Sequence, residues 1–347
     1  MSENITIGER VKATKWLISY WSRQPREAAR GWVRAWLQSN RSHSGQGTTP
    51  GDAAALDERS SELQSLRHRY AAMQDIIGTS TVWRPGFVRQ EDLLYFRGDN
   101  CYVFQNQANN TPEKYVLTYF FLRTIDWLGL LDLFTEDGDF GVFTYPTGDF
   151  DNDGNKRVVS RDLLDSVNEL LWLERTLKVS SLPGLKVLDI GAGYGRLAYR
   201  AVTALSNIDT YYCIDAVPES TFICSYYLSK KGAERACVVP FDEQEKYLTP
   251  GTIKLAINIH SFSECAIEAI EYWIGRCAEL EIEYLFIVPN DSAGEETIHL
   301  VNGFDYTPIL AQHGYHLHTV EPKYSNPELQ KFGVSPAWYY LFRATEG

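Results

Sequence analysis

One decapeptide constrains the fold of this chain more than any other segment. Residues 187–196 read Val-Leu-Asp-Ile-Gly-Ala-Gly-Tyr-Gly-Arg, and the segment that follows them has helical character. The apolar residues at 187, 188 and 190 are typical of a short buried strand. Gly191, Gly193 and Gly195 come directly after it, and glycine permits tight turns and close ligand approach that other residues prevent. The decapeptide therefore predicts a strand, a ligand-binding turn and a helix.

An acidic residue at the end of the next expected strand supports this interpretation. Residues 209–214 form an apolar, aromatic segment that ends in Asp215, and Asp189 ends the strand before the glycines. In nucleotide-binding α/β folds, an acidic residue about twenty positions after the glycines binds the ribose hydroxyls. Both carboxylates are then expected at the carboxyl edge of one sheet. The competing interpretation is an ordinary strand–helix turn with Asp215 as a solvated loop residue.

The second half of the chain predicts the fold class. From residue 184 onward, apolar strand patterns alternate with helical patterns. Strict alternation of this kind gives a doubly wound α/β sheet with helices on both faces. The expected strands lie near residues 186–190, 209–214, 235–240, 253–259, 282–288, 314–320 and 336–343.

The glycine spacing indicates the kind of cofactor. The dinucleotide fingerprint is G-x-G-x-x-G, whereas this chain has G-x-G-x-G with an acidic residue two places before the first glycine. That pattern resembles the first motif of class I S-adenosylmethionine-dependent methyltransferases. The resemblance covers residues 160–345, and the last two strands are similar to the antiparallel terminal hairpin of that family. It implies a seven-stranded, Rossmann-like methyltransferase sheet that binds S-adenosyl-L-methionine.

The resemblance also implies which residues contact the cofactor. Asp189 and the glycine turn would hold the methionine and ribose portions, and Asp215 would bind the ribose hydroxyls. Phe241 and Asp242, after the third strand, would contact the adenine, with the carboxylate accepting a hydrogen bond from its amino group. The expected cofactor-binding residues are Asp189, Gly191, Ala192, Gly193, Asp215, Ala216, Phe241, Asp242 and Asn258.

The end of the fourth strand carries the candidate catalytic residues. Residues 254–259 run into His260-Ser-Phe-Ser-Glu264, and ligands in open α/β sheets bind at the carboxyl ends of strands. An alcohol is a poor nucleophile until its proton leaves, and histidine titrates near neutral pH. We therefore expect His260 to act as a general base, with Glu264 orienting the imidazole. The competing interpretation is a strand-end histidine that bonds to backbone.

A finer resemblance concerns the methyl acceptor. The segment from Asn258 to Glu264, and the helix expected at 160–169 with Ser160 as its cap, are similar to those of the sugar O-methyltransferases, a bacterial subgroup of class I enzymes. The resemblance implies in-line methyl transfer to a hydroxyl of a sugar or glycosylated small molecule, in natural-product or polysaccharide biosynthesis. N-methylation or phenol O-methylation of a small molecule, and a non-catalytic interaction protein with this fold, remain open.

Candidate substrate contacts lie on either side of the glycine motif. Arg161, Asp165 and Glu169 share the helix just before the first strand, where this family commonly covers the cofactor. A solvated acidic face is the competing interpretation of that helix. Asp291, after the fifth strand, is a further candidate. Because Asp291 has no neighbouring aspartate, no metal is expected there.

One acidic motif falls outside this scheme. Residues 149–154 read Asp-Phe-Asp-Asn-Asp-Gly, the opening of a calcium-binding loop. Such a loop needs glutamate at its twelfth position, which is Ser160 in this chain. An acidic, glycine-containing surface turn is therefore expected instead.

The chain before the methyltransferase motif is expected to form two regions. Residues 1–60 predict basic amphipathic helices and a flexible linker, with Trp32 and Trp36 on the apolar stripe. We expect that stripe to contact the protein itself or the partner of a homodimer, and a membrane surface is the alternative. Residues 61–159 are expected to form a helical and irregular region that covers the substrate. Residues 160–347 are expected to form the S-adenosylmethionine-binding methyltransferase domain.

Composition excludes several other classes of protein. The net charge is −12, which argues against a nucleic-acid partner because phosphate binding needs a basic face. The six cysteines form no C-x-x-C pair, so reduced thiols are expected rather than disulfides or a zinc site. The sequence contains neither an apolar run of about eighteen residues nor a signal-peptide pattern. The sequence therefore predicts a cytoplasmic enzyme without a transmembrane segment, whose partner is a small-molecule or glycan acceptor.

Overall fold

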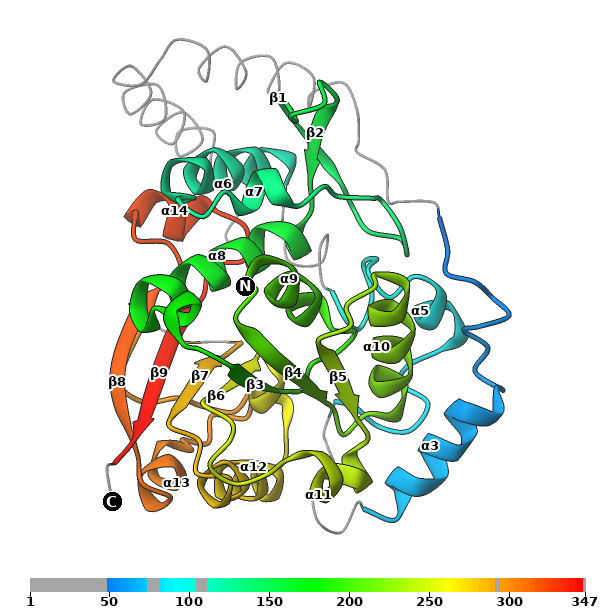
Figure 1. Cartoon of the computed structure of the whole chain (residues 1–347), viewed down its shortest axis with the longest axis vertical. Helices are drawn as coiled ribbons and strands as arrows, with labels where there is room; N and C mark the ends of the chain where they lie inside the picture. Colours follow the sequence, from blue (N-terminus) through cyan, green and yellow to red (C-terminus); the bar gives the residue numbers. More distant parts are fainter. Residues whose placement is uncertain (1–48, 74–81, 104–110, 291, 293, 346–347) are drawn as a thin grey trace. The chain divides into compact units, whose positions relative to one another are not determined.

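A computed structural model describes residues 49–73, 82–103, 111–290, 292 and 294–345. The chain divides into two compact units, which are described separately (Figure 1). Of the described residues, the first unit holds 49–50, Tyr95–Leu171 and Tyr324–Pro336, and the second holds Gly51–Leu94, Trp172–Lys323 and the strand after Ala337. The domain boundaries at 60 and 159 expected from sequence stay a prediction. The basic helices expected before residue 49, with Trp32 and Trp36, lie outside the described residues.

The second unit contains a seven-stranded sheet of order β5-β4-β3-β6-β7-β9-β8. Strands β3 to β7 are parallel to their neighbours, and β9 is antiparallel to both β7 and β8. The predicted doubly wound, seven-stranded sheet with a terminal antiparallel hairpin is therefore confirmed. The strands are β3 (Leu185–Ile190), β4 (Ile208–Ile214), β5 (Ala236–Val239), β6 (Leu255–Ile259), β7 (Tyr284–Val288), β8 (Tyr315–Pro322) and β9 (Trp338–Ala344).

Several helices of this unit connect successive strands of the sheet, and others precede its first strand. Strand order runs outward from β3 to β5 on one side and from β6 to β7 on the other, so right-handed crossovers place helices on opposite faces. Figure 1 shows α9 and α10 on one face of the sheet, with α12 and α13 on the other. The α-helices and the 3-10 helices (η) described in this unit are α3 (Ser61–Ala71), α5 (Gln90–Leu94), α8 (Arg161–Leu177, shared with the first unit), η1 (Val179–Ser181), α9 (Arg196–Ala204), α10 (Pro218–Lys230), η2 (Phe241–Glu243), α11 (Gln244–Tyr247), η3 (Ser261–Glu264), α12 (Ile267–Glu279) and α13 (Thr307–Gln312).

The core of the sheet lies at its centre. Leu285, Phe286 and Ile287 of β7 are fully buried, as is Leu188 of β3. Strands covered by helices on both faces read as continuous apolar runs in the sequence. The ring of Trp172 stacks on Phe286 with centroids 4.9 Å apart and covers one face of β7.

The first unit combines helices with a small antiparallel hairpin. Its elements are α6 (Pro112–Ile125), α7 (Leu130–Leu133), β1 (Tyr145–Phe150), β2 (Lys156–Val159), the first part of α8 and α14 (Pro327–Phe332). Pro112 stands at the first helical position of α6, where its missing N–H costs no helical bond. Ser160 caps α8, as expected, because its Oγ accepts a hydrogen bond from the N–H of Leu163 at 3.0 Å.

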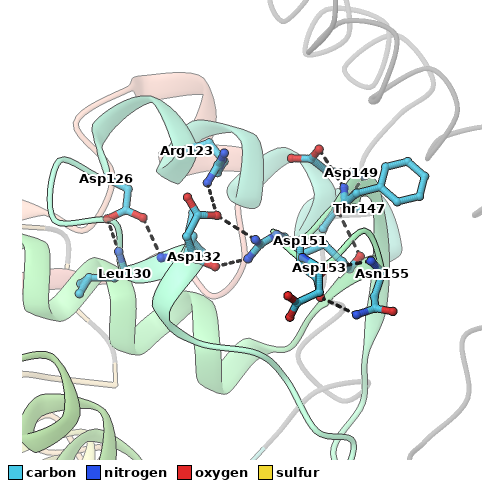
Figure 2. A network of polar contacts seen from close by, with 12 residues as sticks. Arg123, Asp126, Leu130, Asp132, Thr147, Asp149, Asp151, Asp153 and Asn155 are labelled. Atoms are coloured by element: carbon cyan, nitrogen blue, oxygen red, sulfur yellow. Dashed lines mark hydrogen bonds and ion pairs between the residues drawn. The ribbon is translucent and has the colours of Figure 1, made fainter.

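The acidic motif at 149–154 covers the end of β1 and the turn that leads to β2 (Figure 2). Asp151 Oδ1 accepts hydrogen bonds from the backbone N–H groups of Asp153 at 3.0 Å and Asn155 at 2.8 Å. These bonds lower the pKa of the Asp151 carboxyl below its usual value. Asp149 accepts from the hydroxyl of Tyr119 at 2.8 Å, which ties the hairpin to α6. The motif is thus an acidic turn whose first loop carboxylate binds its own backbone.

A buried arginine organises the first unit. Arg97 is 1% exposed. Its Nε donates to Asp162 at 3.0 Å, its Nη1 donates to Asp137 at 2.8 Å, and its Nη2 donates to Glu136. Glu136 also accepts from the hydroxyl of Ser160, the cap of α8. One guanidinium therefore holds three carboxylates at the start of α8, where the helix dipole also favours negative charge.

Replacing Arg97 tests how much the stability of the first unit depends on this guanidinium. Arg97→Met should lower the free energy of unfolding by about 3–5 kcal/mol, because it leaves buried carboxylates without their counter-charge. Arg123→Met is the matched control, since Arg123 makes one half-exposed ion pair with Asp132 at 2.8 Å and should cost about 1 kcal/mol or less. Urea unfolding followed by circular dichroism measures both. Equal losses in the two variants would contradict the role given to Arg97.

Candidate cofactor site

The glycine turn after β3 is held against the ends of both neighbouring strands. The N–H groups of Gly191 and Ala192 donate to the carbonyl of Ile214 at 2.8 and 3.2 Å, which fixes the turn to the end of β4. Gly191 has φ +75°, and a Cβ built on it would stand 2.1 Å from the Oγ of Ser261. Only glycine fits at this position, because both the backbone angle and the contact with the segment after β6 exclude a side chain.

Asp215 leaves the end of β4 and faces the glycine turn. Its Oδ2 accepts a hydrogen bond from the N–H of Gly193 at 3.1 Å, and its Oδ1 accepts from the N–H of Val217 at 2.8 Å. The residue is half-buried, and burial raises the pKa of its carboxyl to about 6. Each carboxylate oxygen has two acceptor sites, so the pair can still accept hydrogen bonds from adjacent hydroxyl groups. Asp215 is therefore built into the turn rather than solvated in a loop.

Asp189 is more deeply placed than Asp215. It is buried near the end of β3, and its Oδ2 accepts from the hydroxyl of Tyr211 on β4 at 2.9 Å. Asp189 on β3 and Asp215 directly after β4 thus lie at the same edge of the sheet, because the two parallel strands pair with Asp189 beside Cys213. Their contact with a cofactor stays a prediction.

Asn258 joins the end of β6 to the end of β3. It is fully buried, and its Nδ2 donates to the carbonyl of Ile190 at 2.8 Å and to the Oγ of Ser261 at 2.5 Å. Its Oδ1 accepts from the N–H of Phe262 at 3.0 Å. These bonds hold Ser261 against Gly191, so Asn258 fixes the position of the residue that contacts the glycine turn.

His260 occupies an unusual backbone conformation between β6 and η3. Its φ is +68° and its ψ is −32°, a combination that costs a residue with a side chain of order 1–3 kcal/mol. Its N–H donates to the carbonyl of Val288 on β7 at 2.7 Å, and its carbonyl accepts from Ser263 at 3.2 Å. Backbone strain of this kind is concentrated at functional sites. His260 stands next to Ser261, the residue that touches the glycine turn.

The Glu264 carboxylate accepts hydrogen bonds from two other segments of the chain. Its Oε2 accepts from the indole N–H of Trp83 at 2.6 Å, and its Oε1 accepts from the amide of Asn290 at 2.8 Å. Asn290 follows β7, and Trp83 precedes α5 by several residues. Sequence reasoning expected Glu264 to orient His260, which stays a prediction, and it gave no role to Trp83. No local pattern links positions 83 and 264, so only the folded chain brings them together.

The segment after β5 has partners that the sequence did not indicate. Phe241 is buried and packs edge-to-face against Tyr70 of α3, with ring centroids 6.0 Å apart. The carboxylate of Asp242 accepts two hydrogen bonds from Arg69, at 2.7 Å from Nε and 2.6 Å from Nη2. This ion pair lowers the pKa of the Asp242 carboxyl below its usual value. α3 therefore lies over both residues predicted to contact adenine.

The candidate substrate residues of α8 belong to the first unit. Asp165 and Glu169 are buried, the latter only 3% exposed, so the solvated acidic face considered for this helix is wrong. Arg161 Nε donates to Asp165 Oδ2 at 3.2 Å, one turn along the helix. Asp291 lies outside the described residues. A substrate contact of any of these side chains stays a prediction.

Two further findings concern the described residues. In the part of the chain that the structure describes, no group of three or more His, Cys, Asp or Glu side chains is arranged to hold a metal ion. Among the helices of the same residues, none combines the length and apolarity that crossing a bilayer requires.

Comparison with known proteins finds similarity of fold. No protein-family model and no curated protein sequence matches the chain. The [4+2]-cyclase SpnF is 16% identical with a TM-score of 0.41, over 57% of this chain and 86% of SpnF. A SAM-dependent methyltransferase from Aquifex aeolicus is 18% identical with a TM-score of 0.37, over 49% of this chain and 87% of that one. M. capricolum TrmK, solved with S-adenosyl-homocysteine, is 15% identical with a TM-score of 0.33, over 50% and 68%. At these levels the similarity concerns the course of the chain alone.

The two turn glycines give a matched test of the site's geometry. Gly191→Ala should lower the free energy of unfolding by about 2–4 kcal/mol, since strain at positive φ adds to the clash with Ser261. Gly193→Ala should cost about 1–2 kcal/mol from backbone strain alone, because nothing lies within 4 Å of the Cβ it would gain. Thermal or urea unfolding compares the two. A Gly193 variant as unstable as the Gly191 variant would contradict the close approach described here.

Proposed function

We propose that this chain is an S-adenosylmethionine-dependent methyltransferase. The observation that carries the proposal is the half-buried Asp215 carboxylate, which accepts the N–H of Gly193 at 3.1 Å beside the point where strand order reverses between β3 and β6. Ligands of open α/β sheets bind at such switch points, outside the carboxyl ends of the strands. A carboxylate fixed there by backbone N–H groups suits a ribose, whose two adjacent hydroxyls are hydrogen-bond donors.

The residues around Asp215 fit the rest of this cofactor. The space beside Gly193 is open within 4 Å of the Cβ that the residue lacks, which suits close approach of a ligand to the backbone. Asp189 and the turn would bind the methionine portion, with Ala192 and Ala216 as small neighbours. Phe241 and Asp242 would contact the adenine from the end of β5. Asn258 would act indirectly, by holding Ser261 against the glycine turn.

The proposed chemistry is methyl transfer to a hydroxyl oxygen. Bound S-adenosylmethionine would supply an electrophilic methyl group. His260 would accept the proton of the acceptor hydroxyl at an imidazole nitrogen, as a general base whose ordinary pKa lies near neutrality. Its backbone, fixed by Val288 and Ser263, would hold the imidazole at the end of β6 beside the glycine turn. Such assistance contributes about a hundred- to ten-thousandfold in rate.

We propose a sugar or glycosylated small molecule as the acceptor. The support is the group of Glu264, Asn290 and Trp83, in which the Glu264 carboxylate accepts hydrogen bonds from both the Asn290 amide and the Trp83 indole beyond the ends of β6 and β7. Polar side chains beside an aromatic ring suit a ligand that has both hydroxyl groups and apolar C–H faces. The resemblance of the segment from Asn258 to Glu264 to sugar O-methyltransferases points the same way.

Titration of Asp215 tests the ribose contact. Hydroxyl donors stabilise the ionised carboxylate, so binding should lower its pKa from about 6 and should weaken as the pH falls through that value. The dissociation constant of S-adenosylhomocysteine should rise about tenfold for each pH unit below 6. Asp215→Asn should bind more weakly at pH 7, by about tenfold or more, and should lose the pH dependence.

Isothermal titration calorimetry between pH 5 and 7 makes this measurement. Asp209→Asn is the matched control, because Asp209 lies on the same strand, has an exposed side chain and is remote from the turn. An Asp215 variant that binds as tightly as the parent would refute the site. A parent protein that does not bind the probe at any pH would refute the proposed cofactor.

Replacing His260 tests the proposed base. His260→Ala should lower the rate of methyl transfer by about a hundredfold or more, while the affinity for S-adenosylhomocysteine changes little. His313→Ala is the control, since His313 pairs with Glu271 between α13 and α12. The assay follows transfer of a radiolabelled methyl group to a panel of monosaccharides and glycosides. Parental turnover in the alanine variant would place the base elsewhere, and loss of cofactor binding would make His260 structural.

A further inference from the structure

We propose that Arg69 of α3 is a specificity-determining residue of the cofactor site, which positions the Asp242 carboxylate to recognise the 6-amino group of adenine. This inference rests on the proposed function, and it concerns a helix that lies outside the predicted methyltransferase motif. α3 spans Ser61–Ala71, more than a hundred residues before the glycine turn. It packs beside α10 and next to η2, which contains Phe241 and Asp242.

The first observation is the geometry of the Arg69–Asp242 pair. The guanidinium donates to both carboxylate oxygens of Asp242, at 2.7 and 2.6 Å, and to Glu243 at 2.7 Å. A bidentate pair of this kind fixes the plane of the carboxylate as well as its charge. Each oxygen retains a second acceptor site. Asp242 is therefore held ionised, in one orientation, with acceptor capacity directed away from α3.

The second observation is a chain of hydrogen bonds through Tyr70, the next residue of α3. The N–H of Phe241 donates to the Tyr70 oxygen at 2.7 Å, and the Tyr70 hydroxyl lies 3.0 Å from the hydroxyl of Thr221. Thr221 in turn donates to the carbonyl of Asp215 at 3.4 Å. The Tyr70 hydroxyl therefore bonds to both Phe241 and Thr221, and either hydroxyl of the Tyr70–Thr221 pair can be the donor.

This chain fixes α3 relative to the proposed adenosine site. Tyr70, Thr221 and Phe241 are all buried, so the chain is shielded from water. It connects the end of β5, where the adenine would lie, to Asp215, where the ribose would lie. The last turn of α3 is therefore held at both strand ends, and Arg69 projects from that turn onto Asp242.

The chemical consequence concerns the base. An ionised carboxylate accepts a hydrogen bond from the 6-amino group of adenine, whereas hypoxanthine presents an oxygen at the same position and would face a negative charge. Sites built to hydrogen-bond a ligand group reject analogues that leave the polar group unpaired. Discrimination between the two bases should therefore depend on the orientation that Arg69 imposes.

Arg67 provides a matched control for the substitution of Arg69. This residue is on the same helix and pairs with Glu219 of α10 at 2.8 Å, with a side-chain exposure of 30% against 32% for Arg69. Arg67→Met removes a comparable ion pair that fastens α3 without touching Phe241 or Asp242. Any effect due only to loosening α3 should therefore appear in both variants.

Isothermal titration calorimetry with S-adenosylhomocysteine and S-inosylhomocysteine tests the proposal on the full-length protein. The parent should prefer the adenine compound by about tenfold to a hundredfold. Arg69→Met should lower affinity for the adenine compound by about tenfold and leave the inosine compound within about twofold, so the preference collapses. Arg67→Met should keep the parental preference.

The outcomes separate the inference from the proposed function. An unchanged preference in Arg69→Met, or an equal loss for both compounds, would overturn the role of Arg69. Arg69→Lys keeps the charge without the two-pronged geometry, so it should show an intermediate preference and serves if the methionine variant does not fold. A parental preference in Arg69→Lys would also overturn the inference. If the parent binds neither compound, the proposed cofactor is wrong.

Discussion

The geometry of the site depends on the close approach of Gly191 to Ser261. A Cβ at position 191 would stand 2.1 Å from the serine oxygen, so the turn after β3 and the segment after β6 meet with no side chain between them. Asn258 sustains this approach by bonding to Ile190 on one side and Ser261 on the other. Because the two strands flank the reversal of strand order, one close contact influences both the proposed cofactor turn and the position of His260.

The carboxylates at the edge of the sheet differ according to their partners. Asp215 receives backbone N–H groups, but burial dominates and raises the pKa of its carboxyl to about 6. Asp242 receives a guanidinium, which lowers the pKa of its carboxyl. Pairs of acids whose environments move their pKa values in opposite directions commonly have different roles. Here the first would respond to the hydroxyls of a ribose near neutral pH, and the second would remain an ionised acceptor.

The sequence predicted the sheet well and the surroundings of the site poorly. Predicted strands such as 186–190 and 209–214 agree closely with β3 (Leu185–Ile190) and β4 (Ile208–Ile214), because parallel strands buried on both faces read as apolar runs. The glycine turn follows from local conformational demands. The pairing of Arg69 with Asp242 joins residues 173 positions apart, and surface-like arginines have no pattern that identifies their partners. The burial of Glu169 was missed for the same reason, since helical periodicity shows which side chains share a face and does not show what covers them.

His260, the proposed base, and Glu264, the neighbouring acid, are held in place by different hydrogen-bond partners. A positive φ at a residue with a side chain persists only where its surroundings enforce it, and here Val288 and Ser263 bind the His260 backbone on both sides. The direction in which the side chain leaves the main chain is then set by the backbone. The carboxylate of Glu264 meanwhile accepts from Trp83 and Asn290, on the segments before α5 and after β7. In the proposed reaction His260 would accept the proton, and Glu264, besides its predicted role in orienting the imidazole, would contact the acceptor together with its two donors.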